Sequence, residues 1–291
     1  NRVVMDNINV GLLVGSYVTV EASDLVFSQV GMASLDAVNA NINGERWFSR
    51  VAPDAYTSFY VNNSSVSLTD VDVAGGMLGM GFAGSSSLNL SRALVSYNAG
   101  SGIDLIGPDL SASLSDISVN HAQLFPFVLK FADVDVERLH IQSSRTLAIS
   151  AYASDFDVTD LTINDVTPLR NQNFDNLRNY YEDVLVDDLE GLAGYFGQAL
   201  LALGGSSVSV TRANITEVTE VGIWAKDEGT TVSVSDFYIA DVEESLQEVG
   251  VGLWADTGAK ISAERGLIER CATDGVYARD EGTEIELVDI A

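Results

Sequence analysis

The chain is poor in cysteine, proline and positive charge. Cys271 is the single cysteine among 291 residues, which excludes an intrachain disulfide framework. Four prolines beside 25 glycines exclude a collagen-like or proline-rich fibrous protein. Fifteen basic residues against 42 acidic ones leave a formal charge of −27, which repels phosphate backbones and anionic membranes. We therefore expect no nucleic-acid partner.

Long apolar runs are also absent. No run approaches the ~20 residues that a membrane-spanning helix needs, so we expect no membrane span. Hydrophobic residues nevertheless make up 46% of the chain, enough to bury a sizeable core. The many Ser, Thr, Asp and Gly residues suit short strands separated by turns.

A short alternating pattern recurs along most of the chain: apolar, x, apolar, x, x, small or apolar, x, apolar. Alternation over two residues is typical of a β-strand, and the two-residue break predicts a bend between two short strands. The basic interval between copies is 22 to 24 residues. The copies span residues 18–25, 66–73, 88–95, 112–119, 134–141, 156–163, 208–215, 232–239, 261–268 and 285–290.

A third short strand follows several copies, as at Gly222–Ala225, and leads into a turn. Three short strands per unit can coil so that each pairs with its equivalent one coil later, ~4.8 Å away. Leucine-rich repeats have a similar period, but their Leu and Asn signature is missing. The pattern predicts an all-β fold, a right-handed parallel β-helix forming a single domain over residues 1–291. Because the pattern starts and stops in mid-coil, we expect this domain to be part of a longer chain.

These repeats resemble those of pectin-lyase-like right-handed β-helices, in particular bacterial surface proteins, over about residues 8 to 291. The resemblance implies a fold and leaves the function open. For a polygalacturonase-like hydrolase it would require Gly-His-Gly and Arg-Ile-Lys motifs, and neither occurs. A lyase would need a basic residue beside calcium-binding carboxylates, and the chain has few lysines. His121 and His140 fall in different coils and have no nucleophile beside them.

Two stretches depart from the basic interval and are predicted insertions. Residues 31–62 hide or replace one coil, and their aromatic residues could cap or cover a sheet. Residues 167–204 place apolar side chains three to four positions apart, which predicts a helix or helical hairpin. We expect that helical insertion to pack against the outside of the solenoid, with docking to a partner or membrane as the alternative.

Three aromatic residues, Trp224, Trp254 and Tyr277, share one position of the third strand and should face outward. Rings stacked at the coil spacing would form a platform for a glycan or a surface protein. The alternative is that the helical insertion, or an extra loop at about 243–248, covers these rings.

Carboxylates recur in the turns after these strands, at Asp227, Glu228, Asp256, Asp280 and Glu281. Stacked like charges repel one another unless they are solvated or bridged by a hard cation such as Ca²⁺. These turns are therefore a candidate Ca²⁺ site, with solvated turn residues as the alternative. No calcium-binding nonapeptide or EF-hand pattern is present, and we expect no other cofactor.

The sequence favours a non-enzymatic extracellular or cell-surface module, acting as a rigid stalk, a fibre or an adhesive element. Its expected partners are a glycan or a surface protein. One alternative is a polysaccharide lyase or glycoside hydrolase acting along the β-helix face, for which Asp135 and Asp157 form the aligned carboxylate pair. Another is a filament subunit that self-associates by stacking end to end.

Overall fold

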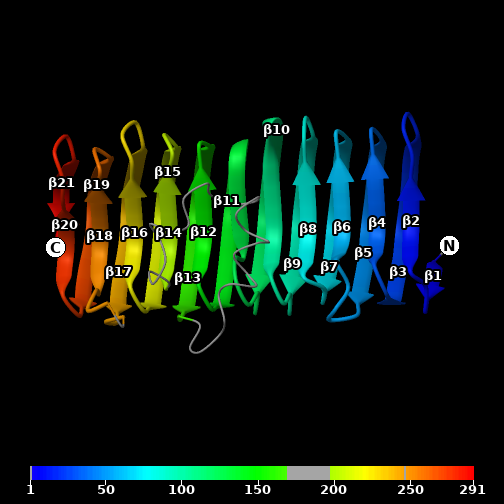
Figure 1. Cartoon of the computed structure of the whole chain (residues 1–291), viewed down its shortest axis with the longest axis horizontal. Coiled ribbons are helices and arrows are strands. Elements are labelled where there is room, and N and C mark those ends of the chain that lie inside the picture. The colour runs from blue at the N-terminus through cyan, green and yellow to red at the C-terminus, as the bar shows by residue number, and fades with distance from the viewer. Residues whose placement is uncertain (1, 169–196, 246) are drawn as a thin grey trace.

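The computed structural model describes residues 2–168, 197–245 and 247–291. In these ranges the chain forms 21 strands and no helix, wound into a parallel β-solenoid of about 11 turns. Figure 1 shows the strands side by side along the long axis, with the two termini at opposite ends. The all-β parallel solenoid is confirmed. Among the described residues there is no helix able to cross a membrane.

Two families of strands alternate along the chain, and each strand pairs in parallel with its equivalent in the next coil. The first family comprises β1 (Val3–Asp6), β3 (Thr19–Val30), β5 (Asn41–Val51), β7 (Ser65–Ala74), β9 (Ser87–Ser96), β13 (Asp155–Val166), β15 (Ser207–Val218), β17 (Thr231–Val242), β19 (Lys260–Cys271) and β21 (Glu284–Ile290). The second family comprises β2 (Val10–Val14), β4 (Ala33–Val38), β6 (Thr57–Asn62), β8 (Leu78–Ala83), β12 (Leu147–Tyr152), β14 (Gln198–Leu203), β16 (Val221–Lys226), β18 (Val251–Asp256) and β20 (Asp274–Ala278). The long strands β10 (Ser101–Asn120) and β11 (Phe127–Ser144) run through both positions.

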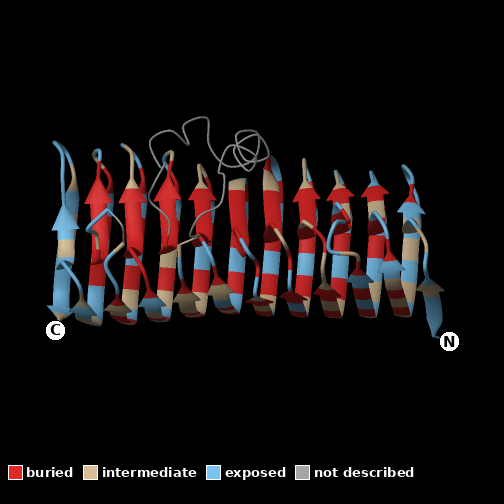
Figure 2. Cartoon of the chain, turned by 60° about the horizontal axis from the view of Figure 1, so that its bottom comes forward, coloured by how far each residue is buried: buried red, intermediate tan, exposed pale blue. Residues whose placement is uncertain are grey.

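Apolar columns form the core because the inward positions of each coil lie in register with those of the next. In β7, Val66, Leu68 and Val71 are buried and pair with the equivalent residues of β9. The bend at Asp70, with φ of 57°, interrupts the alternation so that both arms of the strand face the same core. Figure 2 shows buried residues through the middle of the stack and exposed residues on its end coils.

Residues 31–62 hide a coil, which is the first of the two alternatives for this stretch. This segment contains β4, β5 and β6, and β5 pairs in register with both β3 and β7. Its pattern is unusual because Gly44 takes the register position of Leu68, while Trp47 takes that of Val71. The Trp47 ring is fully buried and fills the space above the glycine. The aromatic residue therefore belongs to the core and does not cap a sheet.

The predicted helical insertion at 167–204 falls mostly on residues 169–196, which lie outside the described residues. At its C-terminal end, Gln198–Leu203 form β14, which pairs with β12 and β16 as an ordinary strand of the solenoid. The coil register therefore continues across this long interval.

Buried serines link successive coils at the corner where a second-family strand leads into the next first-family strand. The Ser64 hydroxyl accepts a hydrogen bond from the Ala40 amide at 2.9 Å, and the Ser86 hydroxyl accepts one from the Ser64 amide at 3.2 Å. Ser154 and Ser206 repeat this arrangement at 3.1 Å. Each of these hydroxyls also donates to a carbonyl of its own coil, so the buried polar groups are satisfied.

Candidate functional site

The three predicted aromatic residues do lie in register on β16, β18 and β20. The Trp224 and Trp254 rings stack with centroids 4.7 Å apart, and Tyr277 meets Trp254 edge-on at 5.4 Å. Trp224 and Trp254 are only 2% and 4% exposed and belong to a second apolar cluster with Leu201 and Val221, separate from the core. The two indoles are therefore covered, whereas Tyr277 is 38% exposed. Binding of a ligand by these residues stays a prediction.

Three of the five carboxylates proposed for calcium, Asp227, Asp256 and Asp280, have other partners. Asp256 is fully buried and pairs with Arg279, with 2.8 Å between Nη2 and Oδ2. Burial raises its pKa, and the nearby Arg279 charge opposes that shift. Asp227 accepts a hydrogen bond from the Gly204 amide at 3.1 Å. Across the described ranges no group of three or more His, Cys, Asp or Glu residues could hold a metal, so Ca²⁺ binding at Asp227, Glu228, Asp256, Asp280 and Glu281 stays a prediction.

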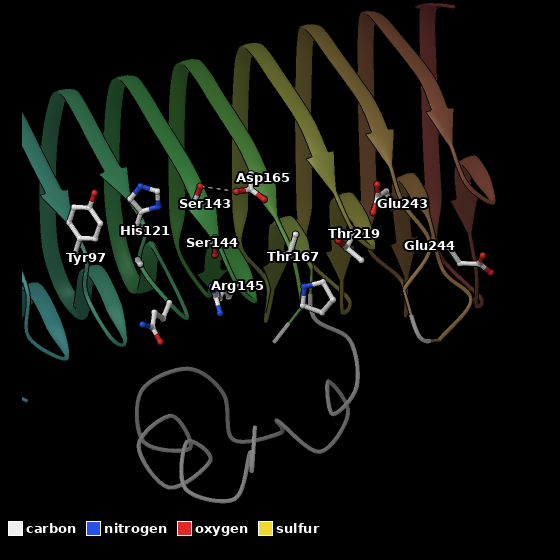
Figure 3. Close-up of a pocket in the computed structure, with 13 residues that line it drawn as sticks. Tyr97, His121, Ser143, Ser144, Arg145, Asp165, Thr167, Thr219, Glu243 and Glu244 are labelled. Atoms are coloured by element: carbon white, nitrogen blue, oxygen red, sulfur yellow. Dashed lines mark hydrogen bonds between the residues drawn. The ribbon is translucent and has the colours of Figure 1, made fainter. Parts of the chain in front are cut away.

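A polar groove of about 830 Å³ runs along the coils at the second bend, where each first-family strand ends. Tyr97, His121, Ser143 and Asp165 occupy this bend in four successive coils, and Figure 3 shows their side chains in a row. The groove continues past Thr219 to Glu243 and Glu244, which follow β17 and lie five coils from Tyr97. At ~4.8 Å per coil, the groove is about 24 Å long. Its lining comprises Tyr97, His121, Ala122, Gln123, Ser143, Ser144, Arg145, Asp165, Thr167, Pro168, Thr219, Glu243 and Glu244.

Tyr97 is the least expected residue of this groove. It is 68% exposed, and its φ of 57° is in the left-handed region, as is that of the equivalent bend residues His121 and Ser143. The ring lies beside His121 with centroids 4.9 Å apart and planes tilted by 30°. An exposed ring brings no gain in core packing, and its apolar face is available to a ligand. Tyr97 is therefore suited to stacking on a flat ligand.

The opposite end of the groove carries negative charge. Asp165 accepts a hydrogen bond from the Ser143 hydroxyl at 2.7 Å, while Glu243 and Glu244 are exposed. Arg145 is the permanent cation among the lining residues. The groove thus offers an aromatic surface at one end and carboxylates that can accept hydrogen bonds or pair with an amine at the other.

A buried carboxylate supports the acidic end of the groove. Glu220 follows Thr219 of the lining and is fully buried, and burial raises its pKa to about 7. It accepts hydrogen bonds from Ser245 Oγ at 3.1 Å and from Gln198 Nε2. These bonds connect the start of β14, the turn before β16 and the segment after β17. Sequence reasoning missed this residue and the groove, and the signal available was the pair of aromatic residues, Tyr97 and His121, at one bend position of adjacent coils.

The aligned pair Asp135 and Asp157 are register partners on β11 and β13, as the repeat predicts. Asp133 and Asp155 pair in the same way, so four exposed carboxylates occupy two adjacent coils. Asp133 and Asp135 border a shallow hollow of about 320 Å³ that is otherwise lined mainly by serines. This hollow is separate from the polar groove.

Comparisons with known proteins identify distant structural likenesses. No protein-family model and no curated protein matches the chain. The crystal structure of a DFA-IIIase from Arthrobacter chlorophenolicus A6 without its lid is 13% identical with a TM-score of 0.40, covering 96% of this chain and 71% of that one.

Two further solved structures are similar at the same level. The catalytic unit of a thermostable GH87 alpha-1,3-glucanase from Streptomyces thermodiastaticus strain HF3-3 is 10% identical with a TM-score of 0.43, covering 99% of this chain and 63% of that one. An alginate lyase from Paenibacillus sp. str. FPU-7 is 9% identical with a TM-score of 0.41, covering 90% of each chain. These similarities are too low to transfer an activity or a site to this chain.

Proposed function

We propose that this protein is a non-enzymatic, extracellular or cell-surface β-solenoid of the pectin-lyase-like type that binds a polysaccharide chain along the polar groove. The observation that carries the proposal is the exposed Tyr97 ring at the end of a groove parallel to the coil axis. A groove about 24 Å long accommodates several sugar rings of an extended chain. Stacking on a sugar face would give this exposed ring a binding role.

Charge narrows the class of polysaccharide. The chain carries a formal charge of −27, and three carboxylates face one arginine in the groove. A polyuronate would be repelled over the whole surface, whereas an uncharged glycan would not be. An amine-bearing glycan would in addition be attracted to Asp165, Glu243 and Glu244. We therefore expect affinity to fall from amine-bearing to neutral to acidic polysaccharides.

Calorimetric titration of the purified chain with a chitosan hexamer, cellohexaose and hexagalacturonate tests this proposal. Tyr97→Ala should weaken binding of the first two about tenfold or more, as expected for loss of an aromatic ring that stacks on the ligand. Tyr17→Ala is the matched control, because Tyr17 is also exposed at a positive φ of 65° and lies outside this groove. Unchanged affinity in Tyr97→Ala, or preferred binding of hexagalacturonate, would contradict the proposal.

A second candidate is glycoside hydrolysis at the face that carries Asp135 and Asp157. Their coils are ~4.8 Å apart, close to the ~5 to 5.5 Å between the carboxyl groups of retaining glycosidases. A reducing-sugar assay on neutral polysaccharides distinguishes the two functions. Turnover that is lost in Asp135→Asn and Asp157→Asn, and kept in the exposed control Asp54→Asn, would establish the enzyme and overturn the non-enzymatic proposal.

A further inference from the structure

The first bend, in the middle of each first-family strand, carries a strictly alternating column of acidic and basic residues. Strand register places one column residue on each successive coil, and from Asp24 onward all have φ between 53° and 64°. We call this column the charge ladder. Its members in order are Arg2, Asp24, Arg46, Asp70, Arg92, Asp116, Arg138, Asp160, Arg212, Asp236, Arg265 and Asp289.

Each arginine from Arg46 onward binds the aspartate of the preceding coil through two nitrogens. In the pair of Arg92 with Asp70, Nε lies 2.5 Å from Oδ1 and Nη2 lies 2.9 Å from Oδ2. The same two-nitrogen geometry recurs in the other four pairs. Hydrogen bonds from Arg92 lower the pKa of Asp70, and the charge of Arg46 on the other side acts in the same direction. The column is therefore one continuous series of opposite charges.

Backbone preference does not explain the arginines. Aspartate tolerates the left-handed region better than most residues, but arginine gains nothing there. Half of the arginines in a chain with a charge of −27 nevertheless occupy this column. The alternation also survives the unequal intervals, 52 residues from Asp160 to Arg212 and 29 from Asp236 to Arg265. The feature common to the whole column is therefore the alternation of positive and negative charge from one coil to the next.

We propose that the charge ladder fixes the stacking register of the coils, and that the period it imposes is two coils. The apolar columns cannot do this alone, because inward Val, Leu and Ile residues recur in every coil and a coil displaced by one step still finds an apolar partner. In the ladder, the same displacement places Asp on Asp and Arg on Arg. Repulsion between like charges thus destabilises a stack in which one coil is displaced by one step. The repetitive apolar core alone would raise the energy of that misaligned stack only slightly.

The test exchanges one pair within the full chain. Asp70→Arg with Arg92→Asp keeps the composition and one ion pair, but it places the introduced guanidinium beside Arg46 and the introduced carboxylate beside Asp116. Asp70→Asn with Arg92→Gln removes both charges and is the matched control. The midpoint temperature of thermal unfolding is measured without denaturant, at about 10 mM and at about 1 M salt. The Debye lengths at these salt concentrations are about 30 Å and 3 Å.

The charge ladder predicts that the exchanged variant is less stable than the neutral variant at low salt, and that the difference closes at high salt. If each ion pair contributed to stability independently of its neighbours, the unfolding midpoint of the exchanged variant would equal or exceed that of the neutral variant. That result would overturn the proposal. Should the exchanged variant fail to fold at low salt, recovery of its structure at high salt supports the proposal. Failure at both salt concentrations, with the neutral variant folded, overturns it.

Discussion

Replacing Trp47 by valine should lower the free energy of unfolding by about 3 kcal/mol or more, since truncating a fully buried indole leaves a cavity. The ring meets Phe27 and Phe59 edge-on, with centroids 6.4 and 5.9 Å away. Its Nε1 also donates a hydrogen bond to the Ala22 carbonyl at 3.0 Å, and the substitution leaves that acceptor without this donor.

Gly44→Leu alone should also destabilise the protein, by about 1–3 kcal/mol, because overpacking forces neighbouring atoms apart. A Cβ at Gly44 would lie 2.5 Å from Cε2 of Trp47. The double variant Gly44→Leu with Trp47→Val is different, because it reproduces the Leu68 and Val71 pair of the next coil. It should recover most of the loss, giving a coupling energy of about 2 kcal/mol or more.

Guanidinium unfolding followed by far-UV circular dichroism measures these differences without relying on the fluorescence of the residue removed. Midpoints are compared among variants whose transition slopes agree, since stacked coils need not unfold in one step. A double variant no more stable than Trp47→Val would refute the idea that the Trp47 ring fills the space left by the missing side chain of Gly44.

Three further outcomes are expected. Burial raises the pKa of Asp104 to about 7, above its usual value of 3.8, so its contribution to stability is lost as pH rises through about 7. Asp104→Asn should therefore flatten the fall in urea midpoint between pH 5 and pH 8; an unchanged slope would contradict this. Trp254→Ala should cost about 3–5 kcal/mol in unfolding experiments, whereas an exposed ring would cost almost nothing. Gly266→Leu should destabilise unless Phe237→Ala accompanies it, because a Cβ would lie within 2.2 Å of the phenylalanine ring.

The sequence predicted the solenoid because its apolar positions alternate on both arms of each bend, and only an inward-facing core uses that alternation. It also predicted registers that the structure confirms, such as Trp224 with Trp254 and Asp135 with Asp157. The coil at 41–51 could not be aligned with the other copies, because the pattern describes each position separately. Gly44 and Trp47 satisfy packing only as a pair.

The charge ladder and the polar groove were missed for a related reason. Asp70 and Arg92 occupy a bend position that the apolar pattern leaves unspecified, so their alternation emerges only when the coils are aligned on the bend. Tyr97 gives no local signal of its own, because its exposure depends on neighbouring coils that lie far away in sequence.

The buried serine corner gives the solenoid a direction. The amide of Ala40 is capped by the hydroxyl of the following coil, whereas that hydroxyl keeps its own-coil partner, the Asn62 carbonyl. Detaching the following coil therefore leaves the Ala40 amide on the new end coil without this acceptor, but detaching the preceding coil leaves no donor unpaired at this corner. Peeling the stack from opposite ends should meet different resistance at this corner, so that mechanical unravelling by pulling proceeds asymmetrically.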